Sequence, residues 1–311
     1  MVIQLPLLLI VGPTGVGKTA VAARLAASIP MEVVSADSRQ VYRGMDAATG
    51  KPTSEEREAV THHLLDLIEP GERYHVARFR LDAVQAIEAI RAAGRLPVVV
   101  GGTGLYVRAL LRGLDPAPPA DPAMRAQLEE IARTGGPAAL HEGLRALDPE
   151  RAARLHPNDR VRIIRAIEKH GRGAPTSEGW ARAVPPWRVV MFGLRRERVA
   201  LNRRLEERAR SMLAGGMMEE VRCLLVAGHD ETAPGMAGIG YRQWAKVTRG
   251  FLSPAEALRL MVRDTQRYAK RQMTWFAREP EIQWLDVDEV GGIEGAAECI
   301  HNHILREGWI A

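Results

Sequence analysis

The feature that most constrains this chain is a glycine-rich segment, Gly12–Thr19, with the sequence GPTGVGKT. It fits the pattern G-x-x-x-x-G-K-[ST] and lies between an apolar run at Leu7–Val11 and a helix expected over Thr19–Ala27. A strand, this loop and a helix in that order form a P-loop, whose backbone amides and helix N-terminus surround a phosphate group. The sequence therefore predicts an α/β fold with a phosphate-binding edge.

Each residue of the P-loop has an expected part in phosphate binding. Lys18 is expected to neutralise the terminal phosphate, and the hydroxyl of Thr19 is expected to bind Mg²⁺. The backbone of the remaining residues is expected to surround the phosphate oxygens; these residues are Gly12, Pro13, Thr14, Gly15, Val16 and Gly17. The motif indicates a diphosphate or triphosphate ligand but does not identify the reaction.

Further apolar segments alternate with helical patterns along the chain. Short apolar runs at Glu32–Ser35 and Pro97–Val100 predict strands, and apolar residues at helical spacing predict a helix over Tyr74–Ala93. Later segments predict strands at Arg188–Leu194 and Ile282–Val287 and long helices at Arg196–Ala227 and Ser253–Arg278. Continuous apolar strands that alternate with helices indicate a parallel sheet with helices on both faces.

The composition changes at Leu114–Pro122, where Asp and Pro dominate. From this boundary to about Gly173 only helices are predicted, and a loop containing Pro, Gly and Ser follows over Gly173–Pro186. The chain is therefore expected to consist of a P-loop NTPase-like α/β core, residues 1–113 and 188–311, and an all-helical insertion domain, residues 114–187.

Composition limits the class of protein. The contents of 46% hydrophobic and 26% charged residues are typical of a globular chain. The apolar run Leu5–Val11 is too short to span a bilayer, and no other stretch approaches membrane length. Cys223 and Cys299 are far apart and form no Cys-x-x-Cys or Cys/His cluster. We therefore expect reduced thiols, no zinc site and a cytoplasmic location.

Polar residues follow the second and third predicted strands. Asp37 comes shortly after the second strand, and Thr103 follows the third within the turn Gly101–Gly104. Because the carboxyl ends of parallel strands share one edge of a sheet, both are expected near the P-loop. Asp37 is then placed to act as a base or to hold Mg²⁺ through water, although a turn or N-cap role is the structural alternative. A packing turn without a ligand is the alternative for the glycines.

These segments occur together with further blocks in a recognisable order: GPTxxGKT at 12–19, Asp37–Tyr42, Lys51–Pro52, His62–Asp66, Gly101–Tyr106, Asn158–Glu168, Gly240–Gln243 and Arg267–Gln272. The series resembles the signature blocks of the tRNA dimethylallyltransferases and extends over most of the chain. The P-loop alone is common to many enzymes, whereas the whole series is specific.

The resemblance implies transfer of a dimethylallyl group from dimethylallyl diphosphate to N6 of the adenosine 3′-adjacent to the anticodon of tRNA. The P-loop would hold the diphosphate with Mg²⁺ and would not hydrolyse ATP. By position, Asp37 matches the family's general base, Thr103 matches a residue beside the reacting centre, and Arg222 matches an arginine on the diphosphate. The implied partners are dimethylallyl diphosphate and the tRNA anticodon stem-loop, without a membrane, and we expect a monomer.

The resemblance also assigns contacts with tRNA. Arg39 and Gln40 adjoin Asp37 and are expected to read the flipped base or its neighbours, since a glutamine amide suits an adenine edge. The full set implied is Asp37, Ser38, Arg39, Gln40, Thr103, Arg125, Val161, Arg162, Ile163, Ile164, Arg165, Gly240, Tyr241, Arg242 and Gln243.

The net charge of +5 comes from a basic side that is almost entirely arginine. A long stripe at helical spacing consists of Arg259, Arg263, Arg267, Lys270 and Arg271, and a shorter one of Arg162, Arg165 and Lys169. Asp264 is the single acid within the span of the long stripe, so we expect pairing within it to leave it basic. An RNA-binding surface and a solvated, salt-bridged helix face both remain possible.

Other functions would use the same loop. A P-loop kinase would use Gly12–Thr19 with Asp37 as base, but it leaves the basic stripes and the Gly101–Tyr106 block unexplained. Prenyl transfer to free AMP or ATP leaves the helical insertion unexplained. A nucleotide-dependent RNA-binding switch of the GTPase kind would carry an Asn-Lys-x-Asp motif, which the sequence lacks.

Two remaining groups of residues are expected to be structural. His62, His63 and Asp66 lack a further ligand at metal-binding spacing, so turn or packing roles are favoured over a metal site. Trp275 and Phe276 are expected to anchor the core rather than to stack on bases.

Overall fold

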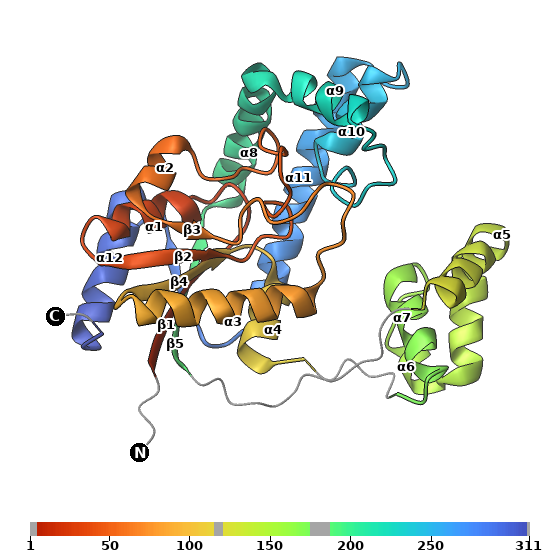
Figure 1. The fold of residues 1–311 in the computed structure, drawn as a ribbon, viewed down its shortest axis with the longest axis horizontal. Helices are drawn as coiled ribbons and strands as arrows, with labels where there is room; N and C mark the ends of the chain where they lie inside the picture. The colour runs from red at the N-terminus through yellow and green to blue at the C-terminus, as the bar shows by residue number, and fades with distance from the viewer. Residues whose placement is uncertain (1–4, 115–120, 175–186, 310–311) are drawn as a thin grey trace. The chain divides into compact units, whose positions relative to one another are not determined.

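The chain divides into two compact units, one formed by residues 1–111 with 185–311 and the other by residues 112–184. The computed structural model describes residues 5–114, 121–174 and 187–309 (Figure 1). Most of the predicted boundary segments, Leu114–Pro122 and Gly173–Pro186, therefore lies outside the described residues. The insertion expected at 114–187 overlaps the second unit almost completely.

A six-stranded parallel sheet with the strand order β3-β2-β4-β1-β5-β6 forms the centre of the first unit. Its strands are β1 (Leu5–Val11), β2 (Met31–Ser35), β3 (His62–His63), β4 (Leu96–Gly101), β5 (Trp187–Arg195) and β6 (Ile282–Asp286). β1 lies between β4 and β5, and its residues from Leu7 to Val11 are fully buried, as a parallel strand covered on both faces requires. The predicted P-loop NTPase-like α/β fold is confirmed.

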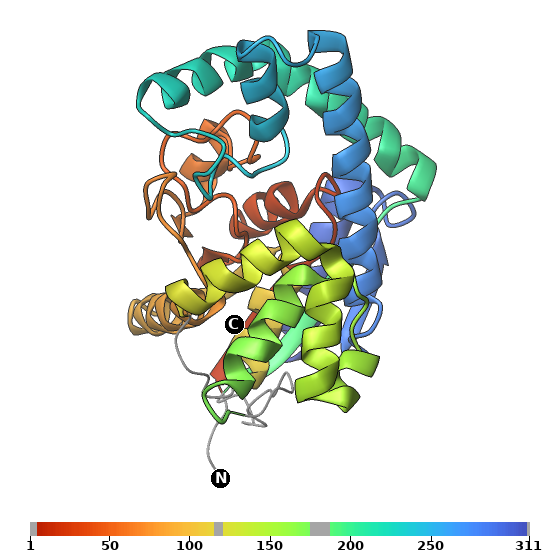
Figure 2. The same cartoon turned by 90° about the vertical axis from the view of Figure 1, so that its right-hand side faces the viewer.

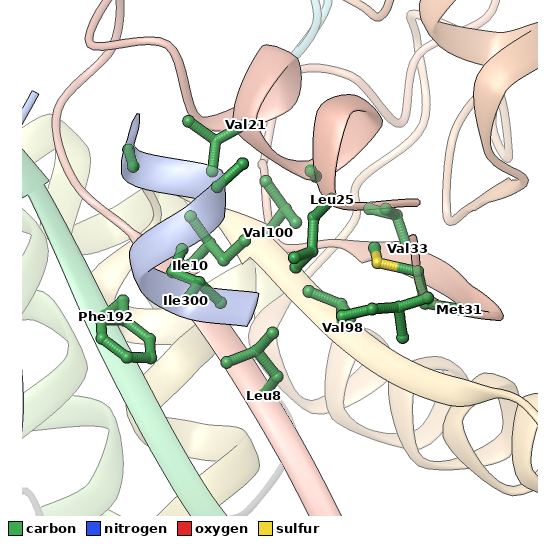
Figure 3. Packing of buried hydrophobic residues seen from close by; sticks show 14 of the residues in the cluster. Leu8, Ile10, Val21, Leu25, Met31, Val33, Val98, Val100, Phe192 and Ile300 are labelled. Atoms are coloured by element: carbon green, nitrogen blue, oxygen red, sulfur yellow. The ribbon is translucent and has the colours of Figure 1, made fainter. Parts of the chain in front are cut away.

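Helices cover both faces of the sheet (Figure 1). On one face lie α1 (Lys18–Ala26) and α12 (Gly292–Arg306), and on the other lie α3 (Val76–Ala92) and α4 (Gly104–Arg112). Figure 3 shows side chains of α1 and α12 packed on alternate residues of the strands, among them Val21, Leu25, Ile300, Leu8, Ile10, Val98 and Val100. The intervening strand residues face the other layer, because successive side chains of a strand alternate between faces.

A further group of helices lies above the sheet in Figure 1: α8 (Arg198–Met212), α9 (Met218–Val226), α10 (Tyr241–Thr248) and α11 (Pro254–Phe276). Its own apolar cluster is centred on the buried rings of Tyr241 and Trp244. α11 belongs to both regions, because Met261 lies in this cluster whereas Phe276 packs against the sheet. Figure 2 shows the same helix running from the upper group down beside the sheet.

The second unit contains three helices in its described residues: α5 (Pro122–Leu147), α6 (Pro149–Ala153) and α7 (Arg160–His170). Gly136 has a φ of 73° and interrupts α5 just before Pro137. Apolar residues of all three helices form one core, which includes Leu140, Leu144, Ala152, Ile163 and Ile164. Among residues 5–114, 121–174 and 187–309, every helix is too short or too polar to cross a lipid bilayer.

The single helix predicted over Arg196–Ala227 is wrong in one respect. Residues Leu213–Met217 form a π-helical turn between α8 and α9, where Gly216 has a φ of 96°. A left-handed residue of this kind ends one helix and redirects the chain into the next. No sequence pattern predicted α2 (Ser54–Ala59), β3, α4, α10 or α12.

Candidate active site

The P-loop connects the end of β1 to the start of α1. Gly12 has a φ of 145°, and a Cβ atom at this residue would lie 2.5 Å from the carbonyl oxygen of Leu194 on β5, so the position requires glycine. The loop forms one wall of a cavity of about 450 Å³, termed here the phosphate cavity. Its lining includes Thr14, Gly15, Gly17, Lys18, Thr19, Ser35, Asp37, Arg204, Arg208 and Gln272.

Lys18 lies in the phosphate cavity with its ammonium group turned back to the loop. Its Nζ donates hydrogen bonds to the carbonyl oxygens of Gly12 and Pro13, at 3.0 and 2.9 Å. Burial lowers the pKa of Lys18 from 10.5 to about 8; the nearby charge of Arg208 lowers it further, and that of Asp37 opposes the shift. A cation that has lost its hydration in this way binds a phosphate oxygen favourably.

α8 supplies two arginines to the phosphate cavity. Arg204 donates from Nε to the carbonyl oxygen of Gly15 at 2.8 Å, which ties α8 to the P-loop. Burial lowers the pKa of Arg208, whose guanidinium forms no hydrogen bond or ion pair with the described part of the chain. Arg222 lies on α9, exposed and 3.6 Å from Glu219, and is not in the lining of this cavity. The structure therefore places Arg208, rather than Arg222, beside the P-loop.

The ends of β2 and β4 bring Asp37 and Thr103 together, as the parallel topology predicts. The amide of Ser38 donates to Oγ1 of Thr103 at 3.1 Å, and the amide of Thr103 donates to the carbonyl oxygen of Ala36 at 3.2 Å. Oδ1 of Asp37 accepts from the amide of Arg39 at 2.8 Å. Asp37 thus has the turn role that was considered as an alternative, and this turn also fixes the direction of its carboxylate.

A second cavity, of about 270 Å³, adjoins the phosphate cavity and is termed here the apolar cavity. Its apolar lining includes Met45, Ala48, Leu205, Ala209, Met212, Ile239 and Met261, and its charged lining includes Arg39, Arg242 and Arg271. Four residues, Thr14, Asp37, Thr49 and Arg208, line both cavities. The carboxylate of Asp37 therefore lies between a basic space and an apolar space.

Tyr268 of α11 lines the apolar cavity next to Asp37 and Thr103. Burial raises the pKa of Tyr268 to about 12, the charge of Asp37 adds to the rise, and a hydrogen bond with Thr103 reduces it. The phenol is therefore neutral at physiological pH. Tyr268 belongs to the block Arg267–Gln272, but no role was predicted for it from the sequence. The available signal was the four-residue spacing of Tyr268 and Gln272, which puts both on one helix face.

Comparisons with known proteins identify the family. The family model described as IPP transferase matches residues 40–279, and the model described as isopentenyl transferase matches residues 5–69. The chain belongs to the IPP transferase family. The resemblance drawn from the sequence blocks is confirmed.

Members of the IPP transferase family are similar to this chain over nearly its whole length. The tRNA dimethylallyltransferase of Thermomicrobium roseum is 48% identical, over 97% of this chain and 92% of that protein. The tRNA dimethylallyltransferase of Desulforudis audaxviator is 44% identical, over 99% of this chain and 100% of that protein. The crystal structure of the full-length tRNA isopentenylpyrophosphate transferase from Bacillus halodurans has 38% identity and a TM-score of 0.71, over 96% of this chain and 95% of that chain.

The residues expected to bind tRNA are not all at the apolar cavity. Asp37, Ser38 and Arg39 line it, whereas Gln40 lines the phosphate cavity. Oε1 of Gln40 accepts from the hydroxyl of Ser35 at 3.0 Å, and Nε2 donates to a backbone carbonyl at 2.8 Å. The expected reading of an adenine edge by Gln40 is therefore not supported, because both ends of its amide are held by the protein.

The block from Gly240 to Gln243 is mainly structural. The hydroxyl of Tyr241 donates to Glu220 at 2.5 Å, and its ring is buried in the apolar cluster formed by α8, α9, α10 and α11. Gln243 is buried, accepts from the amide of Gly240 at 2.8 Å and donates to Asp264 at 3.0 Å. Arg242 differs, since its half-exposed guanidinium lines the apolar cavity.

In the second unit, the expected contacts at Ile163 and Ile164 are wrong. Both side chains are buried in the core of this unit, because α7 is amphipathic and they lie on its apolar face. Val161 is 80% exposed. Arg125 donates two hydrogen bonds, of 3.1 and 2.8 Å, to the buried carboxylate of Glu168, so its main contacts hold the fold. On α7 the half-exposed Arg162 and Arg165 approach carboxylates at 3.6 and 3.4 Å.

The long basic stripe on α11 is partly neutralised. Arg259 pairs with Glu256 at 2.6 Å, and Arg263 pairs with Asp264 at 2.8 Å. The stripe was expected to stay basic despite pairing. This is wrong for Arg259 and Arg263, because Glu256, just before the stripe, supplies a second acid that was not considered. The other half forms a groove, termed here the basic groove, lined by Arg267, Lys270, Arg271, Thr274, Trp275 and Arg278.

The aromatic and histidine residues that were expected to be structural have contacts within the fold. Phe276 is buried as expected, and Trp275 is partly buried against the same core cluster. Trp275 also lines the basic groove, where the guanidinium of Arg108 lies 4.4 Å from its ring centre. His62 contacts the carbonyl oxygen of Val60 at 2.8 Å, and His63 contacts a glutamate on β2 at 2.5 Å.

The phosphate cavity fits a Mg²⁺ ion that arrives with a diphosphate. The described part of the chain contains no group of three or more His, Cys, Asp or Glu side chains that would hold a metal by itself. Mg²⁺ does not need such a group, because it keeps several waters and is held by phosphate oxygens with one or two protein ligands. The hydroxyl of Thr19 lines this cavity together with the carboxylate of Asp37, which is the small oxygen set required.

Proposed function

We propose that this chain transfers the dimethylallyl group of dimethylallyl diphosphate to N6 of the adenosine on the 3′ side of the anticodon in tRNA. The observation that carries the proposal is the place of Asp37 in the wall shared by the phosphate and apolar cavities. Prenyl transfer requires a diphosphate, an apolar chain and a proton acceptor to meet at one point. The relatives compared above are named for this reaction on tRNA.

The donor is held from its diphosphate end. The P-loop backbone, Lys18 and the guanidinium of Arg208 surround the phosphate cavity with positive charge. Such charge stabilises the diphosphate most strongly as it leaves, which is the condition for lowering the barrier. The dimethylallyl chain then extends into the apolar cavity past Leu205 and Met261.

The transfer step takes place beside Asp37. The bond between C1 of the dimethylallyl group and the diphosphate oxygen breaks, the bond between C1 and N6 forms, and the proton of N6 passes to the Asp37 carboxylate. An aromatic exocyclic amine is a weak nucleophile until it loses this proton, so a positioned base accelerates the step. Thr103 and the neutral phenol of Tyr268 lie next to Asp37 and provide polar groups for the acceptor nucleobase.

Mg²⁺ bound through Thr19 would supply further positive charge on the diphosphate during departure of the leaving group. The roles of Lys18 and Arg208 do not depend on the metal. We propose Thr19 as its protein ligand because of the position of the hydroxyl at the start of α1 in the phosphate cavity.

The acceptor enters from the side of the apolar cavity. A base in a tRNA loop has to leave its stack to reach a buried electrophile, and this costs less in a loop than in a duplex. Arg271 lines both the apolar cavity and the basic groove, so the cavity opening is continuous with a surface suited to the phosphates of an RNA strand.

The test is incubation with labelled dimethylallyl diphosphate, Mg²⁺ and unmodified tRNA that carries adenosine 3′ of its anticodon, with AMP and ATP as parallel acceptors. We expect label on the tRNA and none on the free nucleotides. Label on AMP or ATP alone would contradict the tRNA acceptor. Phosphorylation of a small metabolite from ATP, without prenyl transfer, would contradict the donor as well.

A further inference from the structure

α11 contacts both cavities with residues of one face. Met261, Thr265, Tyr268 and Arg271 line the apolar cavity, and Gln272 lines the phosphate cavity. The side chain of Gln272 is nearly fully buried. Its amide therefore has to be satisfied by polar partners, and the identity of these partners shows what the residue does.

The amide of Gln272 is bonded to two loops of the site. Its Oε1 accepts from the amide of Thr14 in the P-loop at 2.9 Å, and its Nε2 donates to the carbonyl oxygen of Gly102 at 2.9 Å. A Cβ atom on Gly102 would collide with this Nε2, so the side chain and the turn are in close contact. One planar group thus connects the loop that binds the donor to the turn that carries Thr103.

We propose that Gln272 is a positioning residue that sets the alignment between the departing diphosphate and the acceptor base. This inference rests on the proposed function. The P-loop fixes the diphosphate, and the Gly102–Thr103 turn fixes the groups around Asp37, so the amide between them determines how N6 faces C1. A displacement of about 1 Å at a reacting centre lowers the rate by about 10². Both polar ends of Gln272 are used by the protein, so binding of either substrate is affected much less.

Substitution of Gln272 by glutamate distinguishes a role in aligning the two loops from a role in packing alone. A protonated carboxyl group has one donor and one acceptor, so it can form both bonds of the native amide, whereas a carboxylate can only accept. Burial raises the pKa of a carboxyl group and brings this change into an accessible pH range. Gln272→Glu is therefore expected to recover activity as the pH falls, because its proton restores the bond to Gly102.

The charged and titratable groups that line the same cavity are Lys18, Asp37, Lys51, Glu56, His62, Arg204, Glu207 and Arg208. They are present in both the wild-type protein and the variant. The ratio of the two rates at each pH therefore removes most of their contribution and leaves the effect of the new carboxyl group.

The experiment measures the single-turnover rate of dimethylallyl transfer to tRNA, and the Kd of each substrate, for the full chain and for Gln272→Ala, Gln272→Glu and Gln272→Met. Gln266→Glu is the matched control, since Gln266 lies on the same helix outside both cavity linings. We expect the rate of Gln272→Ala and Gln272→Met to fall by about 10², with each Kd changed by less than about threefold. The rate of Gln272→Glu relative to wild type should rise at least about tenfold from about pH 8 to about pH 6.

Three results would overturn the inference. A wild-type rate in Gln272→Ala would show that the amide is unnecessary. Losses of the same size in the rate and in both affinities would show a role in packing alone, as would a Gln272→Glu ratio that does not change with pH. Where an uncharged variant fails to fold, as judged by near-UV circular dichroism, the pH ratio of Gln272→Glu decides. A wild-type protein without transfer to tRNA would instead refute the proposed function, and this inference with it.

Discussion

Asp37→Asn separates the proton-accepting role of Asp37 from its role in the turn. The Oδ1 atom of the new side chain can still accept the 2.8 Å bond from the amide of Arg39, so the turn and its contacts with Thr103 are retained. The neutral amide cannot take the proton of N6. Loss of a general base lowers the rate by about 10²–10⁴, which corresponds to about 3–5 kcal/mol of activation free energy. We expect the affinity for tRNA to change little.

The same substitution acts on Lys18 through its charge. The carboxylate of Asp37 favours the protonated form of Lys18, whose pKa is about 8 in the wild-type protein. Removing that carboxylate lowers the pKa of Lys18 further. Because the protonated amine binds the diphosphate, affinity for the donor is lost as the pH rises through this pKa. The loss should therefore begin at a lower pH in Asp37→Asn than in the wild-type protein.

The assay is single-turnover transfer of labelled dimethylallyl to tRNA, with donor affinity measured separately across the alkaline range. Asp230→Asn is the matched control, because Oδ1 of Asp230 also accepts from the amide two residues later, in Thr232, at 2.8 Å. Asp230 lies outside the lining of both cavities. Wild-type turnover in Asp37→Asn would refute the assignment of Asp37 as the general base. Loss of donor affinity at the same pH in both proteins would refute the effect of the Asp37 charge on Lys18.

Three further variants test other parts of the structure. Arg208→Ala should raise KM for dimethylallyl diphosphate by about tenfold or more, whereas Arg222→Ala should not; steady-state kinetics that rank them in the reverse order would contradict the site. Arg125→Ala leaves a buried carboxylate without its bidentate partner and should destabilise the second unit by about 3 kcal/mol, which thermal unfolding of the purified chain would reveal as a lower midpoint. Arg267→Ala should reduce the salt dependence of tRNA binding by about one unit of slope, and the ion-paired Arg259 should contribute less; equal slopes would mean that the basic groove does not contact phosphates.

The core of the fold could be predicted because its signals are local. The apolar run at Leu7–Val11 and the P-loop after it identify a buried parallel strand and the turn that follows it. β3 could not be predicted in this way, because its two residues become a strand only by pairing with Val33 and Val34 on β2. Its existence depends on the position of the rest of the sheet.

The site was predictable only where topology decides it. Asp37 and Thr103 follow two strands whose carboxyl ends share one edge, so their proximity follows from the parallel sheet. Arg208 was missed because the sequence contains many arginines on neighbouring helices, and the packing of α8 on the P-loop selects among them. Ile163 and Ile164 were wrongly predicted to bind tRNA, because every residue of the family block was treated as a contact. The helical periodicity of α7 alone predicts that both side chains are buried in a core.

The order of the strands has a consequence for synthesis on the ribosome. β1 is translated first, yet one of its two neighbours, β5, follows the entire second unit, and Gln272 follows later still. The amide of Thr14 therefore cannot form its hydrogen bond with Gln272 until that residue, much later in the sequence, has been translated. Domains commonly begin to fold as they emerge, so the second unit can form its own core while the first unit is still incomplete. The bond between Thr14 and Gln272, and with it the full wall of the phosphate cavity, can form only after α11 has been translated.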